Sequence, residues 1–123
     1  MVEFRVRYWL IVDSESEMPL GWCGVRPGNS PNEPELLYGL APAAKGRGIA
    51  TEAARAVVEY VLQLPGVESV WAATEPSHSA SIGVMQRIGM TLEGCGELDG
   101  VDSVIYRIRN RAANNAIDRT GEA

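Results

Sequence analysis

Lys45-Gly46-Arg47-Gly48-Ile49-Ala50-Thr51 is the stretch that says most about the fold of this chain. It lies between a strand-like run, residues 35–40, and a long helical pattern that begins near Gly48. Two glycines let the backbone turn tightly and come close to a ligand. Backbone N–H groups that lead into a helix N-terminus form a cradle for anions, and two basic side chains add positive charge there. The stretch therefore predicts a site for a phosphate group.

Two better-known phosphate motifs do not fit this stretch. A P-loop needs Gly-x-x-x-x-Gly-Lys-Ser/Thr, a string that occurs nowhere in the chain. The dinucleotide fingerprint Gly-x-Gly-x-x-Gly would place its third glycine where the chain has Thr51. A basic-x-x-Gly-x-Gly/Ala pattern from Lys45 to Ala50 remains. Taken alone, it fits a turn with a helix cap about as well as a ligand site.

Hydrophobic periodicity predicts six strands and two helices around this loop. Strands are expected at residues 4–12, 20–25, 35–40, 69–74, 91–96 and 103–108, and helices at 48–64 and 79–88. Asp99-Gly100 is a hairpin signal, and Pro65-Gly66 should end the first helix. The apolar positions of that helix predict one broad buried face made of Ile49, Ala53, Ala56, Val57, Tyr60, Val61 and Leu64.

This order of elements predicts an α/β (α+β) fold with a mixed, mostly antiparallel sheet. A β-α-β crossover should run from strand 35–40 through the first helix to strand 69–74. Parallel strands that splay apart open a crevice at their carboxyl ends, which is the usual ligand position. We expect residues 1–109 to form a single domain and residues 110–123 a polar, flexible tail.

Composition narrows the class of protein. Sixteen acidic residues against eleven basic ones give a formal charge of −5, which argues against nucleic-acid binding. No apolar run approaches a membrane span, and no signal peptide is visible, so we expect a cytoplasmic protein. Cys23 and Cys95 are expected to be buried free thiols, and no metal site is predicted. The expected strands contain Trp9, Trp22 and Trp71, which we expect to be core residues rather than stacking partners of a cofactor.

Two longer segments resemble a known family. The run Tyr38-Gly39-Leu40-Ala41-Pro42, continued by residues 45–53, resembles the acetyl-CoA-binding motif of the GNAT-type N-acetyltransferases. The branch it resembles most includes the ribosomal-protein N-terminal acetyltransferases. Glu75-Pro76-Ser77-His78-Ser79-Ala80-Ser81-Ile82, closing with Arg87-Ile88-Gly89-Met90, resembles the Asp/Asn-Pro-x-Asn-x-Ala-Ser turn, short helix and Lys/Arg-Leu-Gly-Phe/Met ending of that branch. Together the segments extend the resemblance over roughly residues 8–108.

The resemblance implies a GNAT-like fold that is shortened at its N-terminus. Family members usually begin with a further strand and two helices that shape one wall of the acceptor site. The first strand of this chain matches the family's second strand. The cofactor half of the family's site is thus expected to be intact, and the acceptor half cut short.

The resemblance also implies acetyl-CoA as cosubstrate and assigns residues to it. Lys45, Gly46, Arg47, Gly48, Ile49, Ala50 and Thr51 would bind the pyrophosphate, and Leu40, Ala41 and Pro42 the pantetheine arm. His78 occupies the place of the family's cofactor-contacting asparagine. An exposed loop histidine is the alternative interpretation. Lys45 keeps the charge of the family's usual arginine but loses its planar bidentate geometry.

For catalysis, the resemblance implies direct acetyl transfer to an amine without an acyl-enzyme. Glu35 is the candidate base, and a solvated carboxylate at the strand end is the alternative; Glu33 is a weaker candidate. Met85 stands where many family members have the tyrosine that protonates the thiolate, which excludes that acid. Ser81 is the remaining candidate donor, and an ordinary serine in the first helical turn is its alternative.

Three functions stay open at this point. The first is an N-acetyltransferase acting on an amine acceptor, either a protein N-terminus or a small molecule. The second is a non-catalytic acyl-CoA-binding module. The third is a structural protein that keeps only the fold and associates through its exposed first strand. A homodimer is compatible with all three.

Overall fold

The elements succeed one another along the chain in the predicted order. The computed structural model describes residues 6–28 and 30–110. Its elements are β1 (Arg7–Val12), β2 (Pro19–Arg26), β3 (Glu35–Leu40), the 3₁₀ turn η1 (Pro42–Ala44), α1 (Ile49–Leu62), β4 (Ser69–Thr74), α2 (Ser79–Arg87), β5 (Thr91–Leu98) and β6 (Val101–Arg109). The start of the first predicted strand and positions 111–123 of the predicted tail lie outside the described residues.

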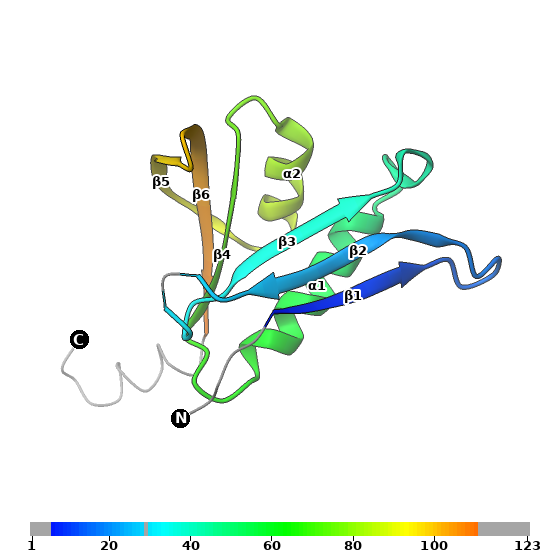
Figure 1. Ribbon diagram of the computed structural model, residues 1–123, viewed down its shortest axis with the longest axis horizontal. Coiled ribbons are helices and arrows are strands. Elements are labelled where there is room, and N and C mark those ends of the chain that lie inside the picture. The colour runs from blue at the N-terminus through cyan, green and yellow to red at the C-terminus, as the bar shows by residue number, and fades with distance from the viewer. Residues whose placement is uncertain (1–5, 29, 111–123) are drawn as a thin grey trace.

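Within the described residues, six strands form one sheet in the order β1-β2-β3-β4-β6-β5 (Figure 1). Neighbouring strands are antiparallel except β3 and β4, which are parallel and connected through α1. This is the predicted mixed sheet with its central β-α-β crossover, so the predicted fold class is confirmed. β1 and β5 form the two edges of the sheet.

The β5–β6 hairpin follows from its turn residues. Asp99 and Gly100 both have positive φ, 51° and 81°, as a two-residue type I′ turn requires. Because the turn takes only these two residues, pairing continues up to Leu98 and Val101. Both strands are therefore longer than predicted.

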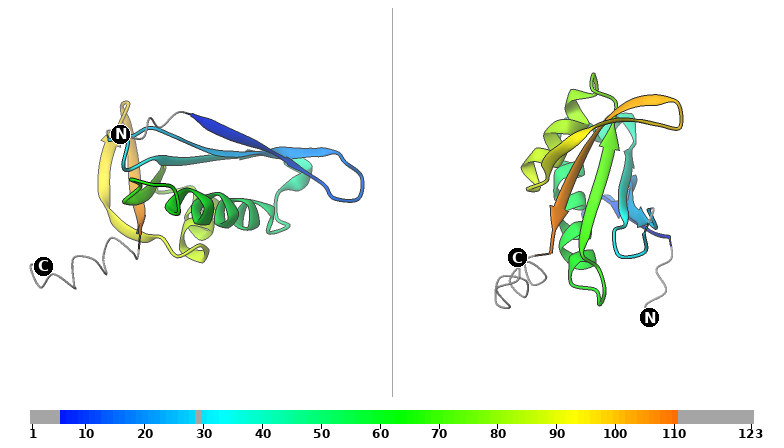
Figure 2. Two further views of the ribbon diagram at one scale, coloured as in Figure 1. Left: turned by 90° about the horizontal axis from the view of Figure 1, so that it is seen from below. Right: turned by 90° about the vertical axis from the view of Figure 1, so that its left-hand side faces the viewer.

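Both helices lie on the same face of the sheet (Figure 2). The core between the helices and the sheet consists of alternate strand residues, one stripe of α1, two residues of α2 and residues that flank the helices. They are Cys23, Val25, Leu36, Val70, Ala72 and Tyr106 from strands, Ala54, Val57, Val58 and Val61 from α1, Val84 and Met85 from α2, and Val67, Ile88 and Met90 beside the helices. Burying large apolar side chains in this layer contributes most of the stability of such a domain.

The broad buried face predicted for α1 is wrong in part. Val57 and Val61 are buried as predicted, but Tyr60 is 46% exposed. Ile49, Ala53, Ala56 and Tyr60 line an open hollow beside β1, which we call the β1–α1 hollow. The apolar positions of α1 thus form two adjacent stripes, because successive helical residues are rotated by about 100°. One stripe packs on the sheet, and the other faces the hollow.

Two tryptophans and one cysteine are more exposed than predicted. Trp9 is 38% exposed and Trp22 40%, while Cys95 is exposed and Cys23 buried, both as free thiols. Trp9 and Cys95 lie on the edge strands, which have a neighbour on one side only. Trp22 lies on the face of β2 that neither helix covers, since its neighbour Cys23 points into the core.

Candidate functional site

The two parallel strands at the centre of the sheet diverge soon after they meet. β3 and β4 pair only where Glu35 lies opposite Trp71, and beyond that point the strands separate (Figure 1). The loop into α1 follows the carboxyl end of β3, and α2 follows that of β4. The divergence is the predicted splay. Because β3 and β4 are parallel, the loop and α2 both lie at the end of the sheet where these two strands separate.

A cleft of about 920 Å³ opens between the end of β3, the start of α1 and α2, and we call it the α1–α2 cleft. Most of the predicted site residues line it. These are Leu40, Lys45, Gly46, Gly48, Ile49, Ala50, Thr51, His78 and Ser81. Residues that the sequence brings from three separate segments therefore share one cleft.

The glycine loop has the geometry of an anion cradle. Gly46 and Gly48 adopt left-handed φ values of 78° and 75°, and a methyl group at either position would meet no atom within 4 Å. Gly48 is the N-cap of α1, and no side chain caps the helix start. The N–H groups of the first helical turn therefore point out of the helix end without a side-chain partner. The helix dipole adds partial positive charge there.

Not every residue of the predicted phosphate site reaches the cleft. Arg47 lines the β1–α1 hollow instead, with its Nη2 atom 3.7 Å from Asp13 Oδ2. Ala41 and Pro42 lie at the start of η1 and are not among the residues that line the cleft. Asp13 belongs to the β1–β2 turn, so this ion pair could not be foreseen from the local sequence around Arg47.

Tyr38 is a cleft residue whose partnership with Ser81 the sequence does not reveal. Its hydroxyl donates a hydrogen bond to Ser81 Oγ over 3.0 Å, and both side chains line the cleft. Burial raises the pKa of the Tyr38 phenol, and the bond to Ser81 opposes this shift. A neutral Tyr38 donating to Ser81 leaves the Ser81 proton free for another acceptor. The sequence pattern that could have indicated Tyr38 is strand alternation, which places it on the same face of β3 as the buried Leu36.

His78 connects the end of β4 to the start of α2. Its Nδ1 atom lies 3.1 Å from Thr74 Oγ1, and the residue is the N-cap of α2. The side chain thus both lines the cleft and holds the turn between the two elements.

Glu35 lies apart from Ser81, on the face of the sheet away from the helices. Its Oε1 atom accepts a hydrogen bond from Arg26 Nε at 2.7 Å, and its side chain is 12% exposed. The hydrogen bond and charge of Glu35 raise the pKa of Arg26. Glu35 does not line the α1–α2 cleft. It stands at the closed end of the splay, where β3 and β4 are paired.

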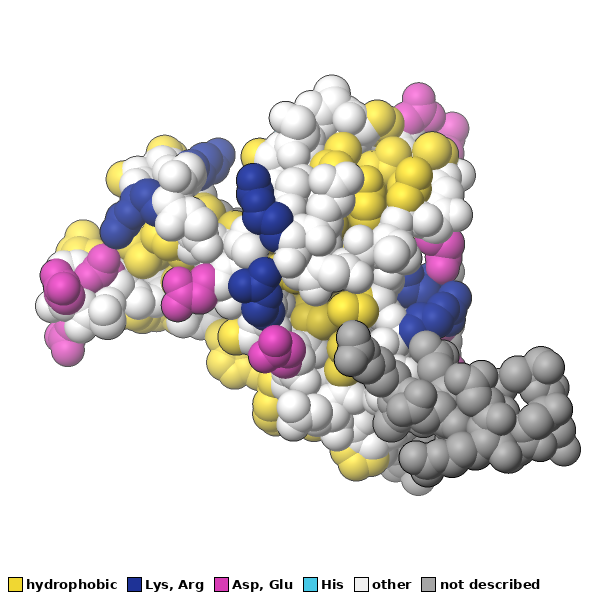
Figure 3. Space-filling view, turned by 180° about the vertical axis from the view of Figure 1, so that it is seen from behind, with side chains coloured by type: hydrophobic (Ala, Val, Ile, Leu, Met, Phe, Trp, Pro, Cys, Tyr) yellow, Lys and Arg dark blue, Asp and Glu magenta, His cyan; other side chains and the backbone are white. Residues whose placement is uncertain are grey.

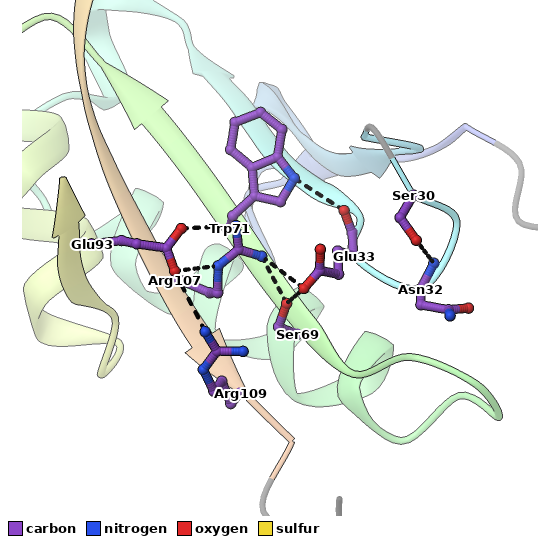
Figure 4. A network of polar contacts seen from close by, with 8 residues as sticks. All are labelled: Ser30, Asn32, Glu33, Ser69, Trp71, Glu93, Arg107 and Arg109. Carbon is purple, nitrogen blue, oxygen red and sulfur yellow. Dashed lines mark hydrogen bonds and ion pairs between the residues drawn. The ribbon is translucent and has the colours of Figure 1, made fainter. Parts of the chain in front are cut away.

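Glu33 is part of a polar network that ties the loop before β3 to the sheet (Figure 4). Its carboxylate accepts a hydrogen bond from Ser69 Oγ at 3.2 Å and pairs with Arg107 at 3.3 Å. Arg107 also holds Glu93 through two hydrogen bonds of 2.7 and 3.0 Å. The Trp71 indole donates to the Glu33 backbone carbonyl. These contacts give Glu33 a structural part in holding the loop.

Two further cleft residues, Arg55 and Arg87, were not among the predicted site residues, although Arg87 belongs to the second motif. Arg55 lies on α1 and Arg87 ends α2, and Arg55 Nη2 donates to the Arg87 carbonyl at 2.8 Å. Figure 3, which views the helix side of the molecule, shows basic side chains on both sides of a hollow in this face.

In the part of the chain that the structure describes, no three His, Cys, Asp or Glu side chains gather into a possible metal site. None of the described helices is long and apolar enough to cross a membrane.

Comparison with known proteins places these features in context. Residues 3–91 match the model of the acetyltransferase (GNAT) domain. An uncharacterized protein of Bacillus subtilis (strain 168), YkkB, is 34% identical over 89 residues, which are 71% of this chain and 52% of that protein. The chain thus spans about half the length of this curated relative.

Solved structures share the fold at lower identity. A ribosomal-protein-S5-alanine acetyltransferase from Vibrio fischeri superimposes with a TM-score of 0.75 at 19% identity, covering 85% of this chain and 62% of the other. The aminoglycoside acetyltransferase AAC(6')-Ib, in complex with coenzyme A and kanamycin, superimposes with a TM-score of 0.77 at 18% identity, covering 89% and 70%. At these identities the likeness shows the fold.

Proposed function

This chain belongs to the GNAT acetyltransferase family, and from that premise we propose that it binds acetyl-CoA in the α1–α2 cleft and transfers the acetyl group directly to an amine. The observation that carries the proposal is the uncapped, glycine-led start of α1 opening into this cleft. An anionic cofactor is the ligand that such a helix start favours. The aminoglycoside acetyltransferase AAC(6')-Ib shares this fold, and its structure in complex with coenzyme A supports the choice of cofactor.

We assign the pyrophosphate to Lys45, Gly46 and the residues 48–51, which line the cleft, and the pantetheine arm to the end of β3. The edge of β3 that faces β4 is paired only at Glu35. Backbone N–H and C=O groups further along this edge are therefore available to the amide groups of the arm. The arm would then run along β3 toward the closed end of the splay.

Transfer requires a neutral amine, because an ammonium ion has no lone pair. The amine nitrogen attacks the thioester carbon, the C–S bond breaks, and the amine loses a proton to a base. Glu35 is the proposed base, and its position on the other face of the sheet suits an acceptor that approaches from there. Glu35→Gln should therefore slow turnover and leave acetyl-CoA affinity nearly unchanged.

Ser81 is the proposed hydrogen-bond donor to the departing thiolate, which then takes its proton from solvent, and Tyr38 is the positioning residue of Ser81. Tyr38 donates to Ser81 Oγ, so the Ser81 proton is directed to another acceptor in the cleft. The Tyr38 phenol is neutral near pH 7, and burial moves its pKa further from that range. Tyr38→Phe should lower kcat with little change in the KM for acetyl-CoA.

The acceptor is proposed to be a protein N-terminus or a small-molecule amine. Structures named for each kind of acceptor, a ribosomal protein and an aminoglycoside, share this fold. The net charge of −5 mildly favours cationic acceptors. We further expect a cytoplasmic location, and a homodimer that pairs through the edge strand β1.

A non-catalytic acyl-CoA-binding module is the second candidate. One contact favours it: the Glu35 carboxylate is already engaged by Arg26. Such a module would bind acetyl-CoA without releasing free CoA thiol when amines are present.

The first test is calorimetric titration with acetyl-CoA, CoA and ATP. Micromolar affinity for acetyl-CoA with weaker ATP binding is expected, and no binding would refute the proposed site. Thiol release with a panel of amines then separates the enzyme from the binding module. A blank without amine corrects for the exposed thiol of Cys95.

A further inference from the structure

Two arginines from different helices meet at the α1–α2 cleft. Arg55 Nη2 donates to the backbone carbonyl of Arg87 at 2.8 Å. The Arg87 guanidinium folds back over Gly83, where a methyl group would lie 3.4 Å from its Nη1 atom. The absence of a side chain at Gly83 thus leaves room for Arg87 to lie along α2. Both arginines line the cleft.

These two guanidinium groups carry uncompensated charge. Among the described residues, no carboxylate forms an ion pair with Arg55 or Arg87. Glu52 also lines the cleft, but it is not paired with either arginine. Lys45 brings a third cation to the same cleft. In a chain with a formal charge of −5, this local excess of positive charge favours an anionic ligand.

The arginines stand beside the predicted phosphate cradle rather than within it. Arg55 is seven residues beyond Gly48, which is about 10 Å along the helix axis. Thr51 and Arg55 are four residues apart and therefore share one face of α1. A ligand bound across this face would place one anionic group on the start of α1 and a second on the arginine pair.

Coenzyme A has this distribution of charge, since its ribose carries a diphosphate at the 5′ carbon and a monoester phosphate at the 3′ carbon. We propose that Arg55 and Arg87 form a subsite for the 3′-phosphate and make the protein selective for CoA over 3′-dephospho-CoA. The inference rests on the proposed function and names the part of the cofactor that is recognised. A monoester phosphate is close to a dianion at neutral pH, and planar guanidinium groups bind its oxygens in pairs.

The test is calorimetric titration of the wild type with CoA, 3′-dephospho-CoA and adenosine 3′,5′-bisphosphate. CoA should bind at least about tenfold more tightly than its dephospho form, the size expected when charged hydrogen bonds to one phosphate are lost. The preference should shrink as the pH falls below about 6, where the phosphate takes up its second proton.

Variants locate the preference in the arginine pair. In Arg55→Gln/Arg87→Gln, affinity for CoA should fall to that for dephospho-CoA, while the dephospho-CoA affinity stays close to that of the wild type. Arg87→Gln alone keeps the Arg55 hydrogen bond, because that bond is made to the Arg87 backbone. This single variant should lose part of the preference for CoA over dephospho-CoA, and it replaces the double variant in the test if the double variant unfolds. Arg7→Gln/Arg109→Gln removes the same charge outside the cleft and should keep the preference.

Equal affinities for CoA and dephospho-CoA in the wild type would overturn the subsite and leave the proposed function standing. A preference that survives in Arg55→Gln/Arg87→Gln, or that disappears in the control variant, would overturn it as well. Failure of all three nucleotides to bind would refute the proposed function itself.

Discussion

Gly48→Ala separates the backbone role of the glycine loop from its role in binding. Gly48 has φ 75° and ψ 6°, and a methyl group there would meet no atom within 4 Å. The folded protein therefore pays only backbone strain, about 1–2 kcal/mol for a left-handed L-residue. Loss of glycine entropy in the unfolded chain offsets about 0.4–1 kcal/mol of this. The net destabilisation is about 1 kcal/mol, or about 4 °C in Tm for a domain of this size.

The same substitution should weaken acetyl-CoA binding far more than it weakens the fold. Gly48 lines the cleft, so under the proposed placement a methyl group there would crowd the pyrophosphate. We expect an affinity loss of at least about tenfold, equivalent to about 1.4 kcal/mol. Gly48→Glu should abolish binding, because it adds a negative charge to a larger side chain.

Gly100→Ala is the matched control. Gly100 has φ 81°, also has no atom within 4 Å of a methyl group, and lies in the β5–β6 turn. It should show the same fall in Tm with unchanged acetyl-CoA affinity. Thermal denaturation and calorimetry on both variants decide the matter. Wild-type affinity in Gly48→Ala, or equal loss of affinity in Gly100→Ala, would refute the placement of the cofactor on this loop.

Three further predictions concern the rest of the molecule. In the native protein at pH 8, only Cys95 should react quickly with a thiol reagent, because Cys23 is buried; two rapid equivalents would contradict the fold. Burial raises the pKa of Cys23 to about 11 from 9.0. The unfolded thiol therefore ionises first, and the free energy of unfolding should fall as the pH rises between these values. A Cys23→Ala variant should show a weaker dependence, with Tyr38 contributing the remainder, and an unchanged one would contradict the burial of this thiol. Arg107 lowers the pKa of Glu93, so this pair stabilises the fold above the ordinary carboxyl pKa and loses its effect as the pH falls. In denaturant titrations of Arg107→Met, the free energy of unfolding should therefore fall less on acidification than in the wild type. An equal fall would contradict the pairing.

The sequence predicted those features that are decided by residues close together in the chain. Residues 35–40 and 69–74 form strands within the predicted limits. Gly48 and the Asp99-Gly100 pair adopt the left-handed backbone that their residue types favour. Two motifs in sequence were enough to indicate the family, because the loop and the start of α2 each carry their own local pattern.

Contacts between distant segments could not be predicted from the sequence. Tyr38 and Ser81 are 43 residues apart, and Arg55 and the Arg87 carbonyl are 32 apart. No local preference of either partner specifies such a contact. The local sequence can also predict a contact that the fold does not make. The position of Arg47 in the motif predicted a phosphate ligand, but its side chain lies toward Asp13.

Backbone preference and hydrophobic period act over a few residues, so the order of the elements, the parallel crossover and the loop that begins α1 could be predicted from local patterns. Packing fixed the rest: which stripe of α1 is buried, which face of the sheet carries Glu35, and which cations reach the cleft. These depend on how far β3 and β4 diverge and on where the two helices pack. Both are outcomes of packing across the whole domain rather than of any single segment.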